Sequence, residues 1–172
     1  RAAQIRFDNV QVPVSALLGQ QGAALPALQQ SVDRATLCVC AEAVGALDML
    51  LHKTVEYSKT RQQFGAPIGS FQALQHRMAD MFIECELARS IVMMAAMTLD
   101  ADVPEAQKQR AVSAAKSRVG KAARKVGQEA VQLHGGIGMT DELDVSHYFK
   151  RVTAIDAMFG NADFHTARFA RL

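Results

Sequence analysis

The spacing of apolar residues predicts long helices along most of the chain. Over residues 25–61 apolar side chains recur every three or four positions, starting with Leu28 and Val32, and this spacing places them on one side of a helix. The same spacing returns over 70–99 and 104–133. Short connections separate these segments, so consecutive helices are expected to run antiparallel.

Residues at the breaks support these boundaries. Ser70 is suited to cap the second helix, because its hydroxyl can accept a free backbone N–H. Pro104 suits the first position of the third helix. Thr140 is expected to cap a fourth segment, which reaches about Lys150, and a further helix is expected near Asn161. The pattern predicts an all-α fold, an up-and-down antiparallel four-helix bundle.

The first 22 residues have a different pattern. Residues 5–13 alternate apolar and polar side chains and end at Pro13, which is typical of a short strand. The rest of the chain offers no sheet for this strand to join. We therefore expect residues 1–22 to be the end of a preceding β-domain with its linker, and 23–172 to be the helical domain. The chain begins at Arg1 without methionine, which suggests a piece of a longer protein.

Composition excludes several classes of function. The net charge is +2 and no nucleic-acid-binding motif occurs, so no nucleic-acid partner is expected. No Glu-x-x-His pair is present, which argues against a di-metal bundle, and no metal site is predicted. We find no run of about eighteen apolar residues and expect no membrane span. The three cysteines are expected to be buried free thiols, in a cytoplasmic protein.

The predicted third helix is rich in basic residues. It carries seven lysines and arginines and only two glutamates over residues 104–134. A solvated helix face accounts for this excess, and a contact with phosphates or with an acidic neighbouring subunit would account for it as well.

Two loops, each at the end of a long predicted helix, carry the most specific chemistry. The first contains Arg61 and Phe64, with Gln72 downstream, and the second contains Gln132 before the pair Gly135-Gly136. Arginine can hold two phosphate oxygens at once, and glycines permit close approach of another group. Taken singly, each loop could also be an ordinary helix end followed by a turn.

The order and spacing of these motifs resemble one enzyme family. Residues 57–72 match the run Y-x-x-x-R-x-x-F-G-x-x-I-x-x-x-Q, and 132–138 match Q-x-x-G-G-x-G. Residues 7–13 with Gly19 look like the family's exit from its middle β-domain. These runs are similar to the flavin-contacting motifs of the acyl-CoA dehydrogenases, and the resemblance covers essentially the whole chain.

The resemblance implies a C-terminal helical domain of a FAD-dependent enzyme that desaturates acyl-CoA thioesters in fatty acid metabolism. In this family FAD lies between subunits of a dimer or tetramer, and an electron-transfer acceptor reoxidises the enzyme. By motif match, the flavin contacts map to Arg61, Phe64, Gln72, Gln132, Gly135 and Gly136.

The sequence departs from the family at the catalytic base. Most members carry a glutamate in a Y-E-G-T run near the C-terminus, and the matching position here is Phe159 or, with a one-residue slip, Gly160. Neither side chain can take a proton. Asp33 is a weak alternative on the first helix, where a solvated first-turn carboxylate is the simpler expectation. Asp156 and Asp163, which flank the lost position, are comparably weak candidates.

Three hypotheses follow. The protein is an acyl-CoA dehydrogenase with an unconventional base, or a non-catalytic partner subunit of a mixed tetramer, or a flavin oxidase or monooxygenase of the same fold. The missing glutamate favours the second.

Overall fold

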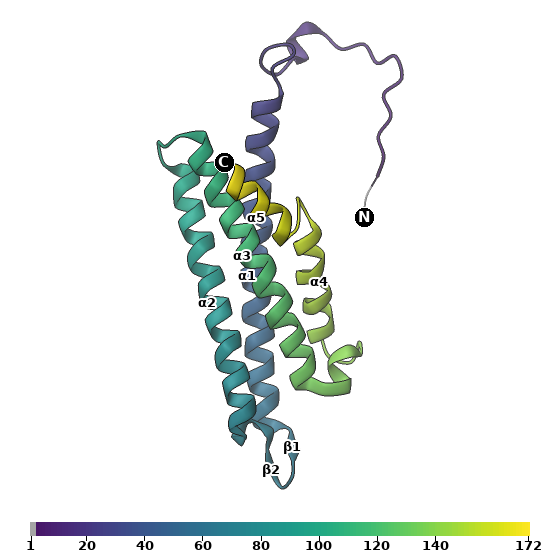
Figure 1. Cartoon of the computed structure of the whole chain (residues 1–172). Coiled ribbons are helices and arrows are strands. Elements are labelled where there is room, and N and C mark those ends of the chain that lie inside the picture. The colour runs from purple at the N-terminus through teal and green to yellow at the C-terminus, as the bar shows by residue number, and fades with distance from the viewer. Residues whose placement is uncertain (1–2) are drawn as a thin grey trace.

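The computed structural model describes residues 3–172, and most of them are helical (Figure 1). The α-helices are α1 (Leu25–Thr60), α2 (Gln72–Asp100), α3 (Glu105–His134), α4 (Val145–Ala157) and α5 (Ala162–Arg171). Three short 3₁₀ turns, η1 (Val14–Ala16), η2 (Ile68–Ser70) and η3 (Gly135–Met139), lie between or before them. Two short strands, β1 (Gln62–Gln63) and β2 (Ala66–Pro67), form a hairpin between α1 and α2.

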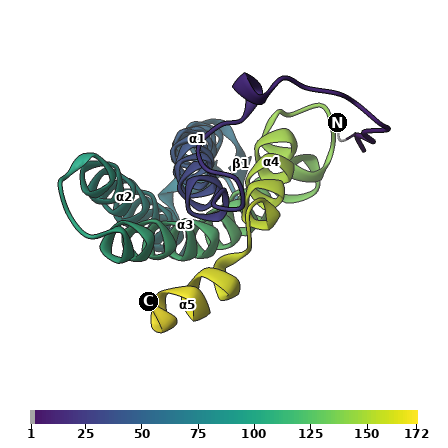
Figure 2. The same cartoon turned by 90° about the horizontal axis from the view of Figure 1, so that it is seen from above.

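The predicted all-α, up-and-down antiparallel fold is confirmed. Helices α1, α2 and α3 run antiparallel in succession, and the shorter α4 returns along α1 and α3 (Figure 1). Helix α3 packs against all four of the other helices, and α5 lies across it near the C-terminus of the chain (Figure 2). The third helix is therefore the centre of the domain.

The core lies between α1, α2, α3 and α4. Its buried side chains are mostly aliphatic and small, and alanines on α3 allow the neighbouring helices to approach closely. Leu28 and Val32, expected at the start of the buried stripe of α1, are exposed because the first turns of this helix extend beyond the bundle (Figure 1). Of the cysteines, Cys40 and Cys85 are buried as expected, and burial raises the pKa of each thiol to about 12, whereas Cys38 is exposed.

The strand expected over residues 5–13 does not form. Residues 3–24 contain only η1 and are exposed throughout. A strand is stable only when a neighbouring strand pairs with its backbone groups, and the described residues provide none here.

Two of the expected caps are also wrong. The Ser70 hydroxyl donates to the Pro67 carbonyl at 2.7 Å, and α2 begins after Phe71. The Thr140 hydroxyl donates to the Ile137 carbonyl at 2.9 Å, and α4 begins after Asp144. In both places the hydroxyl bonds back to a carbonyl in or just before the preceding 3₁₀ turn, η2 or η3, instead of accepting from the N-terminus of the helix.

Helix α1 is long and apolar enough to cross a membrane, by length and composition alone. It is the only such helix among the described residues. Its apolar side chains pack against α2, α3 and α4, and core helices of globular domains often have this composition. The predicted absence of a membrane span stays a prediction.

Candidate functional site

The first loop is a tight hairpin that displays an aromatic ring. Gln62 pairs with Pro67 and Gln63 with Ala66, so Phe64 and Gly65 are the two turn residues. Both have positive φ, 55° and 81°, as a type I′ hairpin turn requires. The Phe64 ring is 93% exposed and meets the edge of Phe71, with ring centroids 6.1 Å apart. The hairpin therefore projects this ring away from the bundle.

The second loop ends α3. Gly135 has φ 68° and ψ −149°, a backbone conformation that is essentially restricted to glycine. Its N–H donates to the carbonyls of Val131 and Gln132, which completes the end of the helix. The Gly135 N–H is therefore not available to a ligand.

The two loops meet around one pocket of about 420 Å³. Four of the six residues that sequence analysis assigned to the flavin line it, namely Arg61, Gln132, Gly135 and Gly136. Phe64 and Gln72 do not line it, and lie beside it on the hairpin and in the first turn of α2. Residues about seventy positions apart in the chain thus form a single site.

Arg61 supplies the positive charge of this pocket. Helices α1 and α3 both end here, and helix C-termini carry partial negative charge, so the backbone alone would repel an anion. Arg77 and Arg151 each pair with a glutamate, whereas the Arg61 guanidinium has no hydrogen-bond or ion-pair partner among residues 3–172. Its five N–H donors remain available to an anionic ligand.

A stacked pair of rings forms another part of the wall. The rings of Tyr57 and His134 lie 4.5 Å apart at 28°. His134 Nδ1 lies 2.8 Å from the Ala130 carbonyl oxygen, which can only accept, so Nδ1 carries a proton. In the neutral ring, Nε2 is then an acceptor. Neither Tyr57 nor His134 was among the six residues expected to contact the flavin. Tyr57 is one helical turn before Arg61, and this spacing was the available signal.

Gly136 leaves space in the pocket. A Cβ built on it meets no atom within 4 Å, and its φ lies outside the left-handed range. Neither packing nor backbone conformation within the domain accounts for glycine at this position. Close approach of a ligand does account for it.

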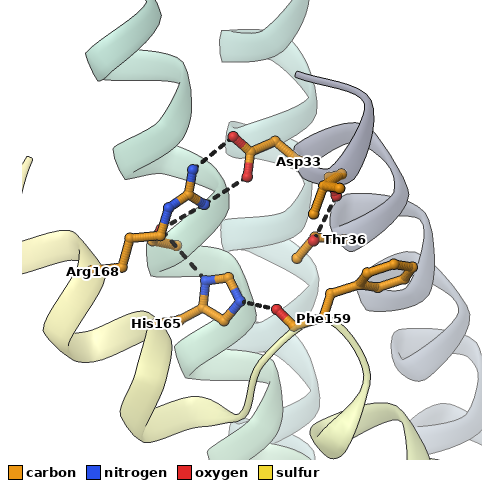
Figure 3. A network of polar contacts seen from close by, with 7 residues as sticks. Asp33, Thr36, Phe159, His165 and Arg168 are labelled. Atoms are coloured by element: carbon orange, nitrogen blue, oxygen red, sulfur yellow. Dashed lines mark hydrogen bonds and ion pairs between the residues drawn. The ribbon is translucent and has the colours of Figure 1, made fainter. Parts of the chain in front are cut away.

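Asp33 is not a solvated carboxylate and has no free oxygen for proton transfer. It is 2% exposed, and its two oxygens accept from the Arg168 guanidinium at 2.6 and 2.8 Å (Figure 3). The sequence could not show this pair, because its members are 135 residues apart. We conclude that Asp33 is a structural ion-pair partner rather than a base.

The remaining candidates for the base are Asp156 and Asp163, which flank the position where the family carries its glutamate. Asp156 accepts a hydrogen bond from the Ala162 N–H at 3.2 Å and lies 3.7 Å from Arg124. Asp163 is in the exposed first turn of α5. Phe159 and Gly160 form the turn between α4 and α5, and neither can accept a proton through its side chain. Asp163 has no hydrogen-bond or ion-pair partner among residues 3–172, so an unengaged carboxylate lies on α5 next to this turn, but none lies at positions 159 and 160 themselves.

The basic residues of α3 find partners within the domain. Arg118 and Lys125 pair with Glu84 of α2, and Arg124 lies beside Asp156 of α4. Much of the positive charge is therefore balanced by neighbouring helices, which supports a structural role for this face.

Comparison with known proteins agrees with this geometry. The family model described as "Acyl-CoA dehydrogenase, C-terminal domain" matches residues 23–172. Acyl-CoA dehydrogenase IpdE2 of Mycobacterium tuberculosis is 43% identical over 119 residues, which is 69% of this chain and 35% of that protein. Probable acyl-CoA dehydrogenase YngJ of Bacillus subtilis is 31% identical over 169 residues, which is 98% of this chain and 44% of that protein.

A solved structure shows the same fold. Butyryl-CoA dehydrogenase of Megasphaera elsdenii superposes with a TM-score of 0.90 at 30% identity, over 96% of this chain and 42% of that chain. The chain thus spans less than half the length of the relatives it matches. The pocket between the two loops and the match over residues 23–172 lead to one conclusion: the chain belongs to the acyl-CoA dehydrogenase family, as its C-terminal helical domain.

Proposed function

We propose that this domain belongs to a FAD-dependent acyl-CoA dehydrogenase and binds the anionic part of the flavin nucleotide. The convergence of Arg61, Gln132 and Gly136 on one pocket supports this proposal. The parent polypeptide would contain the remaining domains, and its substrate would be an acyl-CoA of fatty acid metabolism.

The residues of the pocket fit FAD. The unpaired Arg61 guanidinium suits a pyrophosphate, and the Gln132 amide can donate or accept at a polar edge. Gly136 leaves room for close approach, and the Tyr57–His134 stack offers a planar surface. Phe64 and Gln72, beside the pocket, would extend the contact toward a neighbouring subunit. PigA, whose structure is described with FAD and proline, is 30% identical to this chain with a TM-score of 0.87.

The proposed reaction removes two hydrogens from the acyl group of a thioester. FAD, when bound, supplies the acceptor for the hydride from Cβ. The proton from Cα must pass to a base within hydrogen-bond reach. Neither Phe159 nor Gly160 of the turn can act as this base, so the base of such an enzyme would have to come from another position.

The missing base favours a second candidate function, a non-catalytic subunit in a mixed tetramer. The chain would then complete the flavin site of a catalytic partner. Two solved structures similar to this chain are named as pairs of proteins, the ChsE4-ChsE5 complex of Mycobacterium tuberculosis and the Tcur3481-Tcur3483 steroid ACAD variant. Their sequence identities to this chain are 31% and 32%.

The outer face of α2 supports assembly into an oligomer. Six large apolar side chains are exposed along this helix, and such a continuous patch is typical of a protein interface. They are Phe82, Ile83, Leu87, Met93, Met94 and Met97. We propose a homo-oligomer, dimer or tetramer, or the mixed tetramer, located in the cytoplasm and reoxidised by an electron-transfer protein.

The test of flavin binding is a titration of the purified parent protein with FAD. The parent should show flavin absorbance or take up FAD. Arg61→Ala should weaken FAD binding by about 10- to 100-fold, because charge-assisted hydrogen bonds contribute about 1.5–3 kcal/mol. Lys59→Ala is the matched control, since Lys59 pairs with Glu56. A parent that never takes up FAD would disprove the proposal.

A second assay separates the two candidate functions. The flavin-loaded parent alone is tested against a panel of acyl-CoAs with an artificial electron acceptor. Turnover without any partner chain would eliminate the non-catalytic subunit. If the parent is inactive, Phe159→Glu tests whether the absent carboxylate is the reason.

A further inference from the structure

Buried side chains donate hydrogen bonds to the backbone carbonyls at the turn between α4 and α5. Lys116 of α3 is 0% exposed, and its ammonium donates to the carbonyls of Asp156 at 2.8 Å and Gly160 at 2.7 Å. The Asp156 carbonyl belongs to the last turn of α4, where intrahelical donors are lacking. Lysine is rarely buried completely, because burial of its charge is costly unless acceptors compensate.

A second donor comes from α5. His165 is 1% exposed, and its Nε2 lies 3.0 Å from the Phe159 carbonyl oxygen (Figure 3). A carbonyl can only accept, so Nε2 carries the proton, and Nδ1 is left to accept from the Ser113 hydroxyl at 3.4 Å. Burial lowers the pKa of His165, as do the nearby charges of Lys116 and Arg168, and this agrees with the neutral ring.

The chain of contacts continues to the ion pair on α1. Arg168 donates to the Ser113 oxygen at 3.3 Å and to both oxygens of Asp33. Helices α1, α3 and α5 thus each contribute to one connected polar cluster beneath the turn (Figure 3). Such a cluster can specify one arrangement when its members are satisfied.

The turn itself has an unfavourable backbone. Phe159 has φ 56°, which is uncommon for any residue other than glycine and costly for a bulky one. Gly160 follows with φ 98°. A conformation of this kind persists only where the surrounding structure imposes it. The carbonyls of both residues are drawn to the interior donors, while the Phe159 side chain remains 43% exposed.

We infer that Lys116 and His165 are positioning residues, which hold the Phe159-Gly160 turn in its left-handed conformation and so fix the direction in which the side chain of residue 159 is displayed. The inference rests on the proposed function in one respect: by motif match, the family's base falls at Phe159 or, with a one-residue slip, at Gly160. The direction of the side chain at position 159 does not depend on which residue stands there, because Lys116 and His165 both bond to backbone carbonyls. Lys116 and His165 therefore act through residue 159 and touch no ligand themselves.

The test is ¹⁹F NMR of the full-length parent with a fluorinated phenylalanine placed only at position 159. The parent should give one narrow resonance. His165→Leu, which removes the donor, should broaden or split it, and Lys116→Met should do the same. His165→Gln should restore the single resonance, because its amide nitrogen can replace Nε2 as the donor. Lys53→Met, at the partly exposed pair with Asp144, is the control and should leave the resonance unchanged.

The outcomes separate positioning from plain stabilisation. If His165→Leu lowers the melting temperature but keeps the parent resonance, the two residues are structural only and the inference is overturned. If Lys116→Met does not fold, the comparison of His165→Leu with His165→Gln decides, since both retain the lysine. FAD uptake is measured on the same samples. If the parent takes up no FAD but its resonance still broadens or splits in His165→Leu, the proposed function is refuted and the positioning role stands.

Discussion

Two helices in this domain are each followed by a glycine with positive φ, but the surroundings of the two glycines differ. Helix α3 ends at Gly135-Gly136 and α4 is followed by Phe159-Gly160, and each stretch contains a glycine with positive φ. At the first, the Arg61 guanidinium has no partner among the residues that the structure describes, and Gly136 has open space around it. At the second, buried donors satisfy the carbonyls of Phe159 and Gly160, and a Cβ on Gly160 would clash with a Phe164 ring carbon.

This difference shows how a glycine in a ligand-binding pocket can be distinguished from a glycine that the fold itself requires. Glycine adjacent to unused polar groups and open space indicates room for a ligand, whereas glycine enclosed by its own chain indicates a turn that the fold requires. We therefore expect substitutions at the turn to change stability and substitutions at the pocket to change ligand affinity.

The largest expected effect is loss of the buried ion pair beneath the turn. Arg168→Met would leave the Asp33 carboxylate buried and unpaired, which should lower the free energy of unfolding by about 3–5 kcal/mol. Urea denaturation of the variant and parent measures the change. Lys53→Met, at a more exposed pair, should cost only about 0–1 kcal/mol. Equal losses for the two variants would contradict the structural role assigned to Asp33.

The next effect is at Gly160. Alanine there would have to adopt φ 98° and displace the Phe164 ring, so we expect a loss of about 1–3 kcal/mol in unfolding free energy. The control is Gly45→Ala on α1, where a Cβ meets no atom within 4 Å and φ is not positive. That variant should be neutral or more stable by up to about 1 kcal/mol. A neutral Gly160→Ala would show that the turn relaxes without cost.

A smaller effect is expected in the pH dependence of the unfolding free energy. The pKa of His165 in the folded chain is lowered from 6.5, chiefly by burial, so the unfolded chain binds a proton more readily. Stability from this group is complete above pH 6.5 and is lost as the pH falls toward the lowered folded pKa. Unfolding free energies measured between about pH 7 and pH 5 should decrease less in His165→Gln than in the parent. Identical slopes would mean that His165 is not buried as a neutral ring.

The smallest effect on stability is expected at the pocket. Gly136→Ala and Arg61→Ala should each change the unfolding free energy by no more than about 0.5 kcal/mol, because a Cβ on Gly136 meets no atom within 4 Å and the exposed Arg61 side chain has no hydrogen-bond or ion-pair partner among residues 3–172. Both should weaken FAD binding in the parent protein. A large loss of stability in either variant, measured by thermal denaturation, would remove the distinction between the two helix ends.

Much of the fold could be predicted from local pattern. Apolar spacing gave the three long helices to within two residues of their observed ends, because a helix of this length depends on a repeated local pattern. The shorter elements were less predictable. The fourth helix begins at Val145 rather than after Thr140, and the hairpin at 62–67 was not expected, since hydroxyl caps and turn geometry depend on competing local hydrogen bonds.

The site was predictable as a set of residues but not in its chemistry. Motif order identified Arg61, Gln132, Gly135 and Gly136, which share a pocket. It did not reveal that the Gly135 N–H is already engaged, or that His134 and Tyr57 stack in the wall. Both facts depend on how α1 and α3 end beside each other, which no local pattern encodes.

The sequence by itself determined the family, the helical class and the absence of a carboxylate at position 159 or 160, because each follows from residue identity and spacing. Only the tertiary structure decided what the polar residues do. It paired Asp33 with Arg168 and buried Lys116 beneath the turn, while Arg61 found no partner within residues 3–172. The physical reason is that burial and partnership are properties of helices brought together by packing, and in a bundle those helices can be more than a hundred residues apart.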